Sequence, residues 1–253
     1  MSYSSFTKLM VGDELKELGY VKATKEEWVK IIDKSIFVSV WVQNLHGTMI
    51  FNFKIFPLFG IDPGYYSIMH ILQQKTLAEG GDPAFSGAVL RLYDPGTDNE
   101  KKSIAAGKSI FAIIRPIIEG VTDLESAARA IQKADYLRCF YTYSTRLGRE
   151  YTLEEHIAWP PEPVFFILCK LGKYREAADY LERDLSFFQN FQGTQGDPEF
   201  YESIRKNEHN RIDPLLQLVY EEKYDELERI MQSHYEKNCK EIEKNYKITI
   251  SCQ

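Results

Sequence analysis

The alternation of apolar and polar positions is most regular between residues 35 and 57. A first run with period two extends from Ile36 to Gln43, and a second extends from Met49 to Ile55, with Gly47 in the short loop between them. Two such runs joined by a loop that contains glycine predict an antiparallel β-hairpin. Because large apolar side chains occupy both phases of the alternation, we expect this hairpin to be central to a sheet, with a helix over at least one face.

Shorter patterns precede the hairpin. From Ser4, apolar residues recur at helical spacing until Gly19, which predicts a helix that ends at this glycine. The segments Tyr20–Thr24 and Glu27–Ile32 are rich in aromatic and β-branched residues, as strands are. We therefore expect a helix followed by a four-stranded antiparallel meander.

The stretch after the hairpin predicts further elements of the same domain. Asp62 is placed to cap a helix that continues through the next ten residues or so, and Ala88–Tyr93 has the composition of another strand. Capping boxes that begin at Thr97 and at Thr122 predict two more helices. Pro116 lies inside the first of these helices and should kink or end it.

After residue 135 the pattern becomes one of helices joined by short turns. The phrase LGKYREAADYLERDL, from Leu171 to Leu185, resembles the turn and second helix of a tetratricopeptide repeat, and the stretch from Asp213 to Met231 follows the same plan loosely. Two imperfect units are too few for a free-standing solenoid. The predicted fold is thus α+β, with an antiparallel sheet and helices in residues 1–135 and an α-helical hairpin domain in residues 136–253.

The order of motifs in the first half resembles a known family. After the leading helix come Leu18-Gly19-Tyr20, Trp28, a strand that ends at Gln43, the turn at Gly47 and the aromatic strand Phe51-Asn52-Phe53. This order resembles the bacterial family called domain of unknown function 4304 over roughly residues 5–56, and more loosely to about residue 134. The resemblance implies a small α+β protein of the immunity or accessory type, encoded near bacterial toxins, and it transfers no catalytic residue.

Composition narrows the class of protein. The 253 residues are 44% hydrophobic and 27% charged, which is typical of a soluble globular chain. No stretch has the length of a membrane span, and the start of the sequence lacks the apolar run of a signal peptide. We therefore expect a cytoplasmic protein that does not associate with membranes.

The distribution of charge bears on the partner. Residues 1–135 hold 15 basic and 16 acidic side chains, residues 136–253 hold 16 and 21, and the net charge is −6. Direct binding to nucleic acid is disfavoured, because no segment supplies the basic face that phosphates need. A basic protein partner fits the acidic second half better, and the alternative is that the negative charge serves solubility alone.

No motif with catalytic chemistry is present. The chain lacks a nucleophile elbow, a zinc-protease pair of histidines and a phosphate-binding glycine loop. The four cysteines lack CxxC spacing, and the histidines lie far apart and are never separated by four positions: His46, His70, His156, His209 and His234. We therefore expect no catalytic residue, no cofactor and no metal ligand.

Two groups of residues are candidates for binding a protein partner. The first combines aromatic and acidic side chains around the start of the second half, namely Tyr141, Tyr143, Glu154, Glu155 and Trp159. These rings serve either as interface anchors or as packing between the two halves. The second group is acidic and consists of Glu221, Glu222, Asp225 and Glu226. It either meets a basic surface or is the solvated face of a helix.

The hypothesis that follows is a non-enzymatic cytoplasmic binding protein. Its most concrete form is an immunity-type inhibitor that covers the active surface of a co-encoded bacterial toxin, whose basic surface an acidic partner would match. One alternative is an enzyme of unrecognised class with its site in the cleft between the halves. Another is a scaffold or oligomeric component. The oligomeric state stays open.

Overall fold

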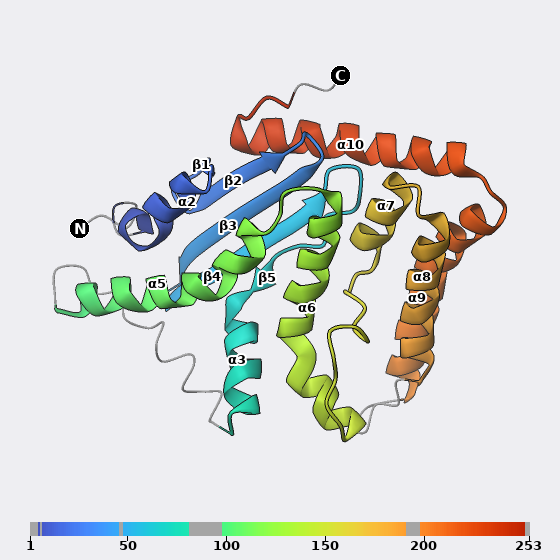
Figure 1. Cartoon of the computed structure of the whole chain (residues 1–253), viewed down its shortest axis with the longest axis horizontal. Helices are drawn as coiled ribbons and strands as arrows, with labels where there is room; N and C mark the ends of the chain where they lie inside the picture. Colours follow the sequence, from blue (N-terminus) through green and yellow to red (C-terminus); the bar gives the residue numbers. More distant parts are fainter. Residues whose placement is uncertain (1–4, 6, 46–47, 81–97, 191–197, 251–253) are drawn as a thin grey trace.

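The computed structural model describes residue 5 and residues 7–45, 48–80, 98–190 and 198–250. Over these residues the chain combines one antiparallel sheet with helices on both of its faces and a stack of helices beside it (Figure 1). The predicted α+β class is confirmed.

Among the described residues, the sheet has five strands in the order of the sequence: β1 (Val21–Lys22), β2 (Glu27–Ile32), β3 (Ile36–Leu45), β4 (Thr48–Pro57) and β5 (Tyr66–Ser67). All neighbouring strands are antiparallel, and β3 and β4 pair along their whole length, from Ile36 opposite Pro57 to Leu45 opposite Thr48. The central hairpin and the meander are therefore confirmed.

Both faces of β3 and β4 are buried, as their double alternation predicts. Val38, Val40 and Phe53 belong to the main core on one face. Phe37 and Phe56 lie on the other face and form a smaller core cluster. Because successive side chains of a strand point to opposite faces, one hairpin supplies both cores and needs a covering layer on each side.

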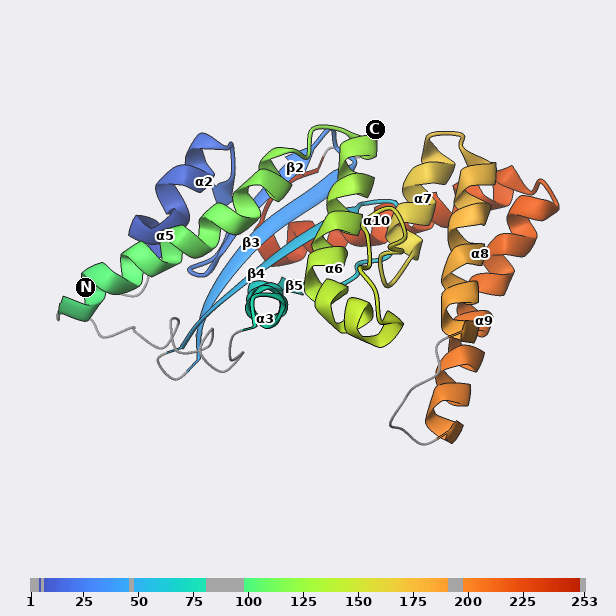
Figure 2. The same cartoon turned by 60° about the horizontal axis from the view of Figure 1, so that its bottom comes forward.

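The first face is covered by helices from the first half of the chain. A π-helical turn η1 (Lys8–Gly12) and α2 (Asp13–Glu17) precede the sheet, and three longer helices follow it: α3 (Ile68–Ala78), α5 (Asp98–Glu119) and α6 (Leu124–Leu147). Figure 2 shows α5 and α6 in front of the strands, with α2 beside them. Phe111 of α5 and Ile131 of α6 are fully buried in the main core.

The second half consists of helical hairpins, as predicted. The helices are α7 (Glu162–Lys170), α8 (Tyr174–Asn190), α9 (Pro198–Tyr220) and α10 (Tyr224–Tyr246). Tight turns join α7 to α8 and α9 to α10, with Gly172 and Glu222 at positive φ. The last helix leaves this stack and crosses behind the sheet (Figures 1 and 2), where Cys239 and Ile242 pack on Phe37 and Phe56.

Three local predictions are corrected by the structure. Tyr66 and Ser67 form strand β5 where a helix was expected, because Tyr66 pairs with Phe53 and its ring packs 5.5 Å from that of Phe53. The capping box of α6 is formed by Asp123 with Ser126 and not by Thr122. Pro116 does not end α5, which continues to Glu119 with Ile114 and Ile118 buried on either side of it.

Two further predictions lie outside the described residues, and the predicted domain boundary lies within a helix. The predicted strand Ala88–Tyr93 and the capping residue Thr97 lie outside the described ranges. The expected boundary between residues 135 and 136 falls in the middle of α6, and the main core continues from the sheet into Phe165 and Phe166 of α7. That position is therefore not a linker between elements.

A buried amide attaches α10 to the rest of the molecule. Asn238 Nδ2 donates to the carbonyl oxygens of Leu58, at 2.7 Å, and of Gly60, at 2.9 Å. We expect Asn238→Ala to lower the free energy of unfolding by about 1–3 kcal/mol, because it leaves two buried carbonyls without a donor. Urea unfolding measures this, with the exposed Asn245→Ala on the same helix as control. Equal stability of the two variants would contradict this role.

Candidate functional site

The candidate site lies where α6 meets the segment that follows it. Gly148 ends α6 in the left-handed conformation, and the chain then runs back along the helix to Pro161, where α7 begins. A segment without regular structure must satisfy its backbone groups with side chains or water when it is buried. Here the side chains of α6 and α8 do so.

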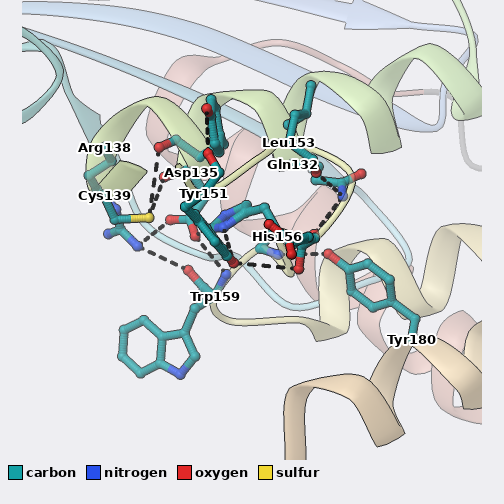
Figure 3. Close-up of polar contacts among 12 residues, drawn as sticks. Gln132, Asp135, Arg138, Cys139, Tyr151, Leu153, His156, Trp159 and Tyr180 are labelled. Atoms are coloured by element: carbon teal, nitrogen blue, oxygen red, sulfur yellow. Dashed lines mark hydrogen bonds and ion pairs between the residues drawn. The ribbon is translucent and has the colours of Figure 1, made fainter. Parts of the chain in front are cut away.

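The centre of the site is a buried pair of Asp135 and His156. His156 Nε2 lies 2.9 Å from Asp135 Oδ2, and His156 Nδ1 lies 3.2 Å from the hydroxyl of Tyr151 (Figure 3). The same Oδ2 accepts a hydrogen bond from the backbone N–H of Trp159 at 3.0 Å, and Oδ1 is paired with Arg138. The histidine is 0% exposed and the aspartate 1%. Both oxygens of the carboxylate and both ring nitrogens therefore have partners within the protein.

Two further side chains hold the backbone of the returning segment. Gln132 Nε2 donates to the carbonyl oxygens of Leu153, at 3.2 Å, and of His156, at 2.6 Å. The hydroxyl of Tyr180 in α8 accepts from the N–H of Ala158 at 2.7 Å. The segment is thus attached to α6 on one side and to α8 on the other.

The site also contains the one group of side chains in the described part of the chain that could coordinate a metal ion. Asp135, Cys139 and His156 each place a ligand atom within 4.8 Å of the others. Zinc accepts such a set when the thiol is ionised. Burial raises the pKa of the Cys139 thiol, and Sγ lies 3.1 Å from the carbonyl oxygen of Asp135, to which it donates. Because Asp135 is already satisfied by Arg138 and by two hydrogen bonds, the arrangement fits a structural network better than a metal centre.

A second buried polar cluster lies beside the first, between α7, α8 and α9. Three carboxylates, Glu162, Asp184 and Glu208, are all at least 95% buried and lie near one guanidinium, that of Arg211. Arg211 forms ion pairs with Glu162 and Glu208. Trp159 connects the two clusters, because its backbone N–H donates to Asp135 and its indole Nε1 lies 3.4 Å from Glu208 Oε1.

Asp184 is the unpaired member of this second cluster. Its Oδ2 has no hydrogen-bond partner among the described residues. Burial, and after it the negative charge of Glu208, raises the pKa of Asp184 to about 8. At neutral pH the carboxyl is therefore mostly protonated, which spares the core a second uncompensated negative charge.

The structure brings the first predicted group of residues to this region. Tyr143 packs inside it, with its ring centroid 5.2 Å from that of Tyr151 and 5.1 Å from that of Phe187 in α8. Tyr141 is half-buried on the same helix, whereas Trp159 is 45% exposed. Tyr143 therefore packs α6 against the returning segment and α8.

The two predicted carboxylates of this region are both exposed, and their environments differ. Glu155 forms two hydrogen bonds with the guanidinium of Arg149, at 2.9 and 2.6 Å, and together with the N–H of Thr152 these contacts lower the pKa of Glu155 to about 2. Glu154 contributes its carbonyl oxygen, which accepts from Arg183 at 2.9 Å.

The predicted acidic group lies elsewhere, at the turn between α9 and α10. Glu221 is ion-paired with Lys223 at 2.5 Å. Glu222, Asp225 and Glu226 are exposed, and their side chains make no hydrogen bond or salt bridge with the described residues.

Sequence reasoning missed the buried polar residues, although a signal was present. Asp184 follows Leu181 by three positions and Tyr180 by four, so it lies on the apolar stripe of its helix. Asp135 follows Ile131 by four positions in the same way. A carboxylate on an apolar stripe is a candidate for a buried, paired group.

Comparison with known proteins gives no relative: no family model matches the chain, and no curated protein or solved structure resembles it significantly. Among the described residues, none of the helices combines the length and apolar character that crossing a membrane requires.

Our first prediction for the site concerns its structural role. Asp135→Asn should lower the free energy of unfolding by about 3–5 kcal/mol, because Arg138 then has no counter-charge. In addition, the new amide N–H₂ would point at hydrogen-bond donors that the carboxylate accepts from. Cys139→Ala should cost only about 1 kcal/mol, and a chelator should not change the unfolding midpoint. Chemical denaturation measures all three. Stoichiometric zinc that survives dialysis and is lost in Cys139→Ala would show that the cluster is a metal centre.

A second prediction concerns pH. The pKa of Asp184 is raised from 3.8 to about 8 in the folded chain, so the folded state holds a proton that the unfolded state releases between these values. The stabilisation of the folded state by this bound proton is complete below pH 4 and is lost as the pH rises to about 8. Over this range the free energy of unfolding falls by at most about 1.4 kcal/mol per pH unit. Asp184→Asn should flatten that decline. Urea unfolding from pH 5 to 8 tests this, with the exposed Asp179→Asn as control, and an unchanged slope in Asp184→Asn would refute it.

Proposed function

We propose that this chain is a cytoplasmic, non-enzymatic binding protein of the immunity type, which covers a basic surface of a co-encoded toxin. The observation that supports the proposal best is the acidic corner, which we define as Glu222, Asp225 and Glu226 with the neighbouring Tyr220. Its three carboxylates are exposed and without a salt bridge to the described residues, and Tyr220 is 60% exposed. The corner therefore offers exposed carboxylates, of which Glu226 interacts electrostatically with Lys223, together with a large aromatic ring.

The acidic corner is held rigidly, which favours its use in binding. The turn places Glu222 at a φ of 54°, and the N–H of Lys223 donates to the carbonyl oxygen of Leu218 at 2.9 Å. Tyr220 is anchored by its hydroxyl, which donates to Glu182 in α8. A binding surface that is already ordered loses less conformational entropy when a partner docks, so more of the contact energy appears as affinity.

The chemistry of the corner fits a basic partner. A lysine or arginine of the partner that approaches these carboxylates gains attraction without first breaking an internal ion pair. Toxins that act on nucleic acid need a basic surface to hold phosphates, so an acidic cover competes for the same surface. The aromatic ring adds the kind of anchor that dominates many protein interfaces.

The buried clusters also support a binding role over catalysis. His156 and Asp135, the residues with the best potential for proton transfer, are enclosed and fully engaged with each other and with Tyr151, Arg138 and Trp159. A general base must come within hydrogen-bond reach of its substrate. The enclosed pair instead holds the returning segment in place.

The experiment is co-purification of the tagged chain with the product of the neighbouring gene, at low and at high salt. We expect a stoichiometric complex that weakens as salt rises. Charge reversal in the triple variant Glu222→Lys, Asp225→Lys, Glu226→Lys should weaken the complex at least tenfold, chiefly through a slower association rate.

A matched control distinguishes the effect of changing the acidic corner from the effect of changing the net charge. Glu17, Glu150 and Glu241 are exposed carboxylates on other parts of the molecule, and their reversal to lysine changes the net charge by the same amount. This control should keep most of the affinity. The proposal fails if the chain is recovered alone, or if both triple variants weaken the complex equally.

A further inference from the structure

A cleft with a volume of about 420 Å³ lies between α6 and the α7–α8 hairpin. Its apolar part is formed by Val164, Leu168 and Leu171. This volume falls in the range of small-molecule sites. Charged side chains make up half of the residues that line the cleft. The described residues that line it do not include those of the acidic corner.

The two walls of the cleft come from regular helical spacing. On α6, Glu125, Arg129 and Gln132 recur at intervals of four and three positions, and on α8, Glu176, Asp179 and Arg183 recur at intervals of three and four. Residues at this spacing lie on one face of a helix. Each wall therefore presents charged side chains from a rigid element, over the apolar part of the cleft.

Some of these charges are used within the protein. Lys173 Nζ pairs with Glu125 at 2.8 Å and connects the two walls near the start of α8. Arg183 donates to the carbonyl oxygen of Glu154 at 2.9 Å. Arg129 on α6, and Glu176 and Asp179 on α8, are exposed, and their side chains make no hydrogen bond or salt bridge with the described residues. At longer range, the charge of Arg129 acts on Asp123 and Glu125, and that of Glu176 acts on Lys173.

Three of the charges that line the cleft, those of Arg129, Glu176 and Asp179, thus form no salt bridge with the described residues. A ligand with only an anionic group would meet Arg129 but would be repelled by Glu176 and Asp179, and a purely cationic ligand would be repelled by Arg129. A ligand with both charges satisfies both walls at once. The apolar residues Val164, Leu168 and Leu171 provide the place for a hydrocarbon side chain.

We infer that the cleft binds a free α-amino acid with an apolar side chain. Its carboxylate pairs with the guanidinium of Arg129, which offers donors that match a carboxylate in shape. Its ammonium lies toward Glu176 and Asp179. Its side chain packs on Val164, Leu168 and Leu171.

The test is calorimetric titration of the whole chain with L-leucine and with two analogues that each lack one charge. L-leucinamide lacks the carboxylate and N-acetyl-L-leucine lacks the ammonium, so each should bind at least tenfold more weakly than L-leucine. L-norleucine, which keeps both charges, should bind within a few fold of L-leucine.

Variants assign each charge to its wall. Arg129→Gln should weaken L-leucine about tenfold and abolish the discrimination between L-leucine and L-leucinamide. The double variant Glu176→Gln, Asp179→Asn should abolish the discrimination between L-leucine and N-acetyl-L-leucine. Lys133→Gln, one turn further along α6, is the control and should leave both discriminations intact. Thermal unfolding confirms that each variant is folded.

Three results would overturn the inference. The first is that neither L-leucine nor L-norleucine binds up to its solubility limit. The second is that L-leucine and its two analogues bind equally. The third is that the dipeptide L-leucyl-L-leucine binds more tightly than L-leucine and is weakened by Arg129→Gln, because the occupant would then be a peptide and not a free amino acid.

Discussion

The burial of the β3–β4 hairpin on both faces is the constraint on which the rest of this structure depends. Val38 and Phe53 require a cover on one side, and Phe37 and Phe56 require one on the other. Helices that are close in sequence to the hairpin cover the face with Val38 and Phe53. The face with Phe37 and Phe56 is covered by α10, which lies almost two hundred residues further on. The last helix therefore packs on the first strands, and the helical hairpins between them are held against α6.

This arrangement explains where the polar groups lie. Packing the hairpins against α6 buries part of the segment between them, and polar groups of this part are satisfied by Gln132, Asp135 and Tyr180. Trp159 then extends the network to the carboxylates around Arg211. Buried polar groups of this kind fix one arrangement of the helices, since a shift of one helix would leave several of them unpaired. The charged groups that remain available to partners are at the surface, at the acidic corner and along the cleft.

The sequence was sufficient for most of the described elements and insufficient for the contacts between them. Period-two alternation located β3 and β4 because it depends only on which side of a strand faces a core. Strand β5 could not be found in this way, because its two residues are too short for any periodicity and are defined by pairing with β4. The Asp135–His156 pair could not be predicted from the sequence for a similar reason. Its members are 21 positions apart and meet only because the segment after α6 turns back. The acidic corner, by contrast, was visible as a local run of carboxylates.

We propose that the acidic corner is the surface through which this protein acts. The most direct measurement is amide hydrogen exchange of the chain alone and in complex with the product of the neighbouring gene. We predict slower exchange in residues 220–226, above all at Tyr224 and Asp225, whose N–H groups lie in the first turn of α10 and have no acceptor within that helix. Protection confined to other surfaces, with exchange at residues 220–226 unchanged in a stable complex, would contradict it.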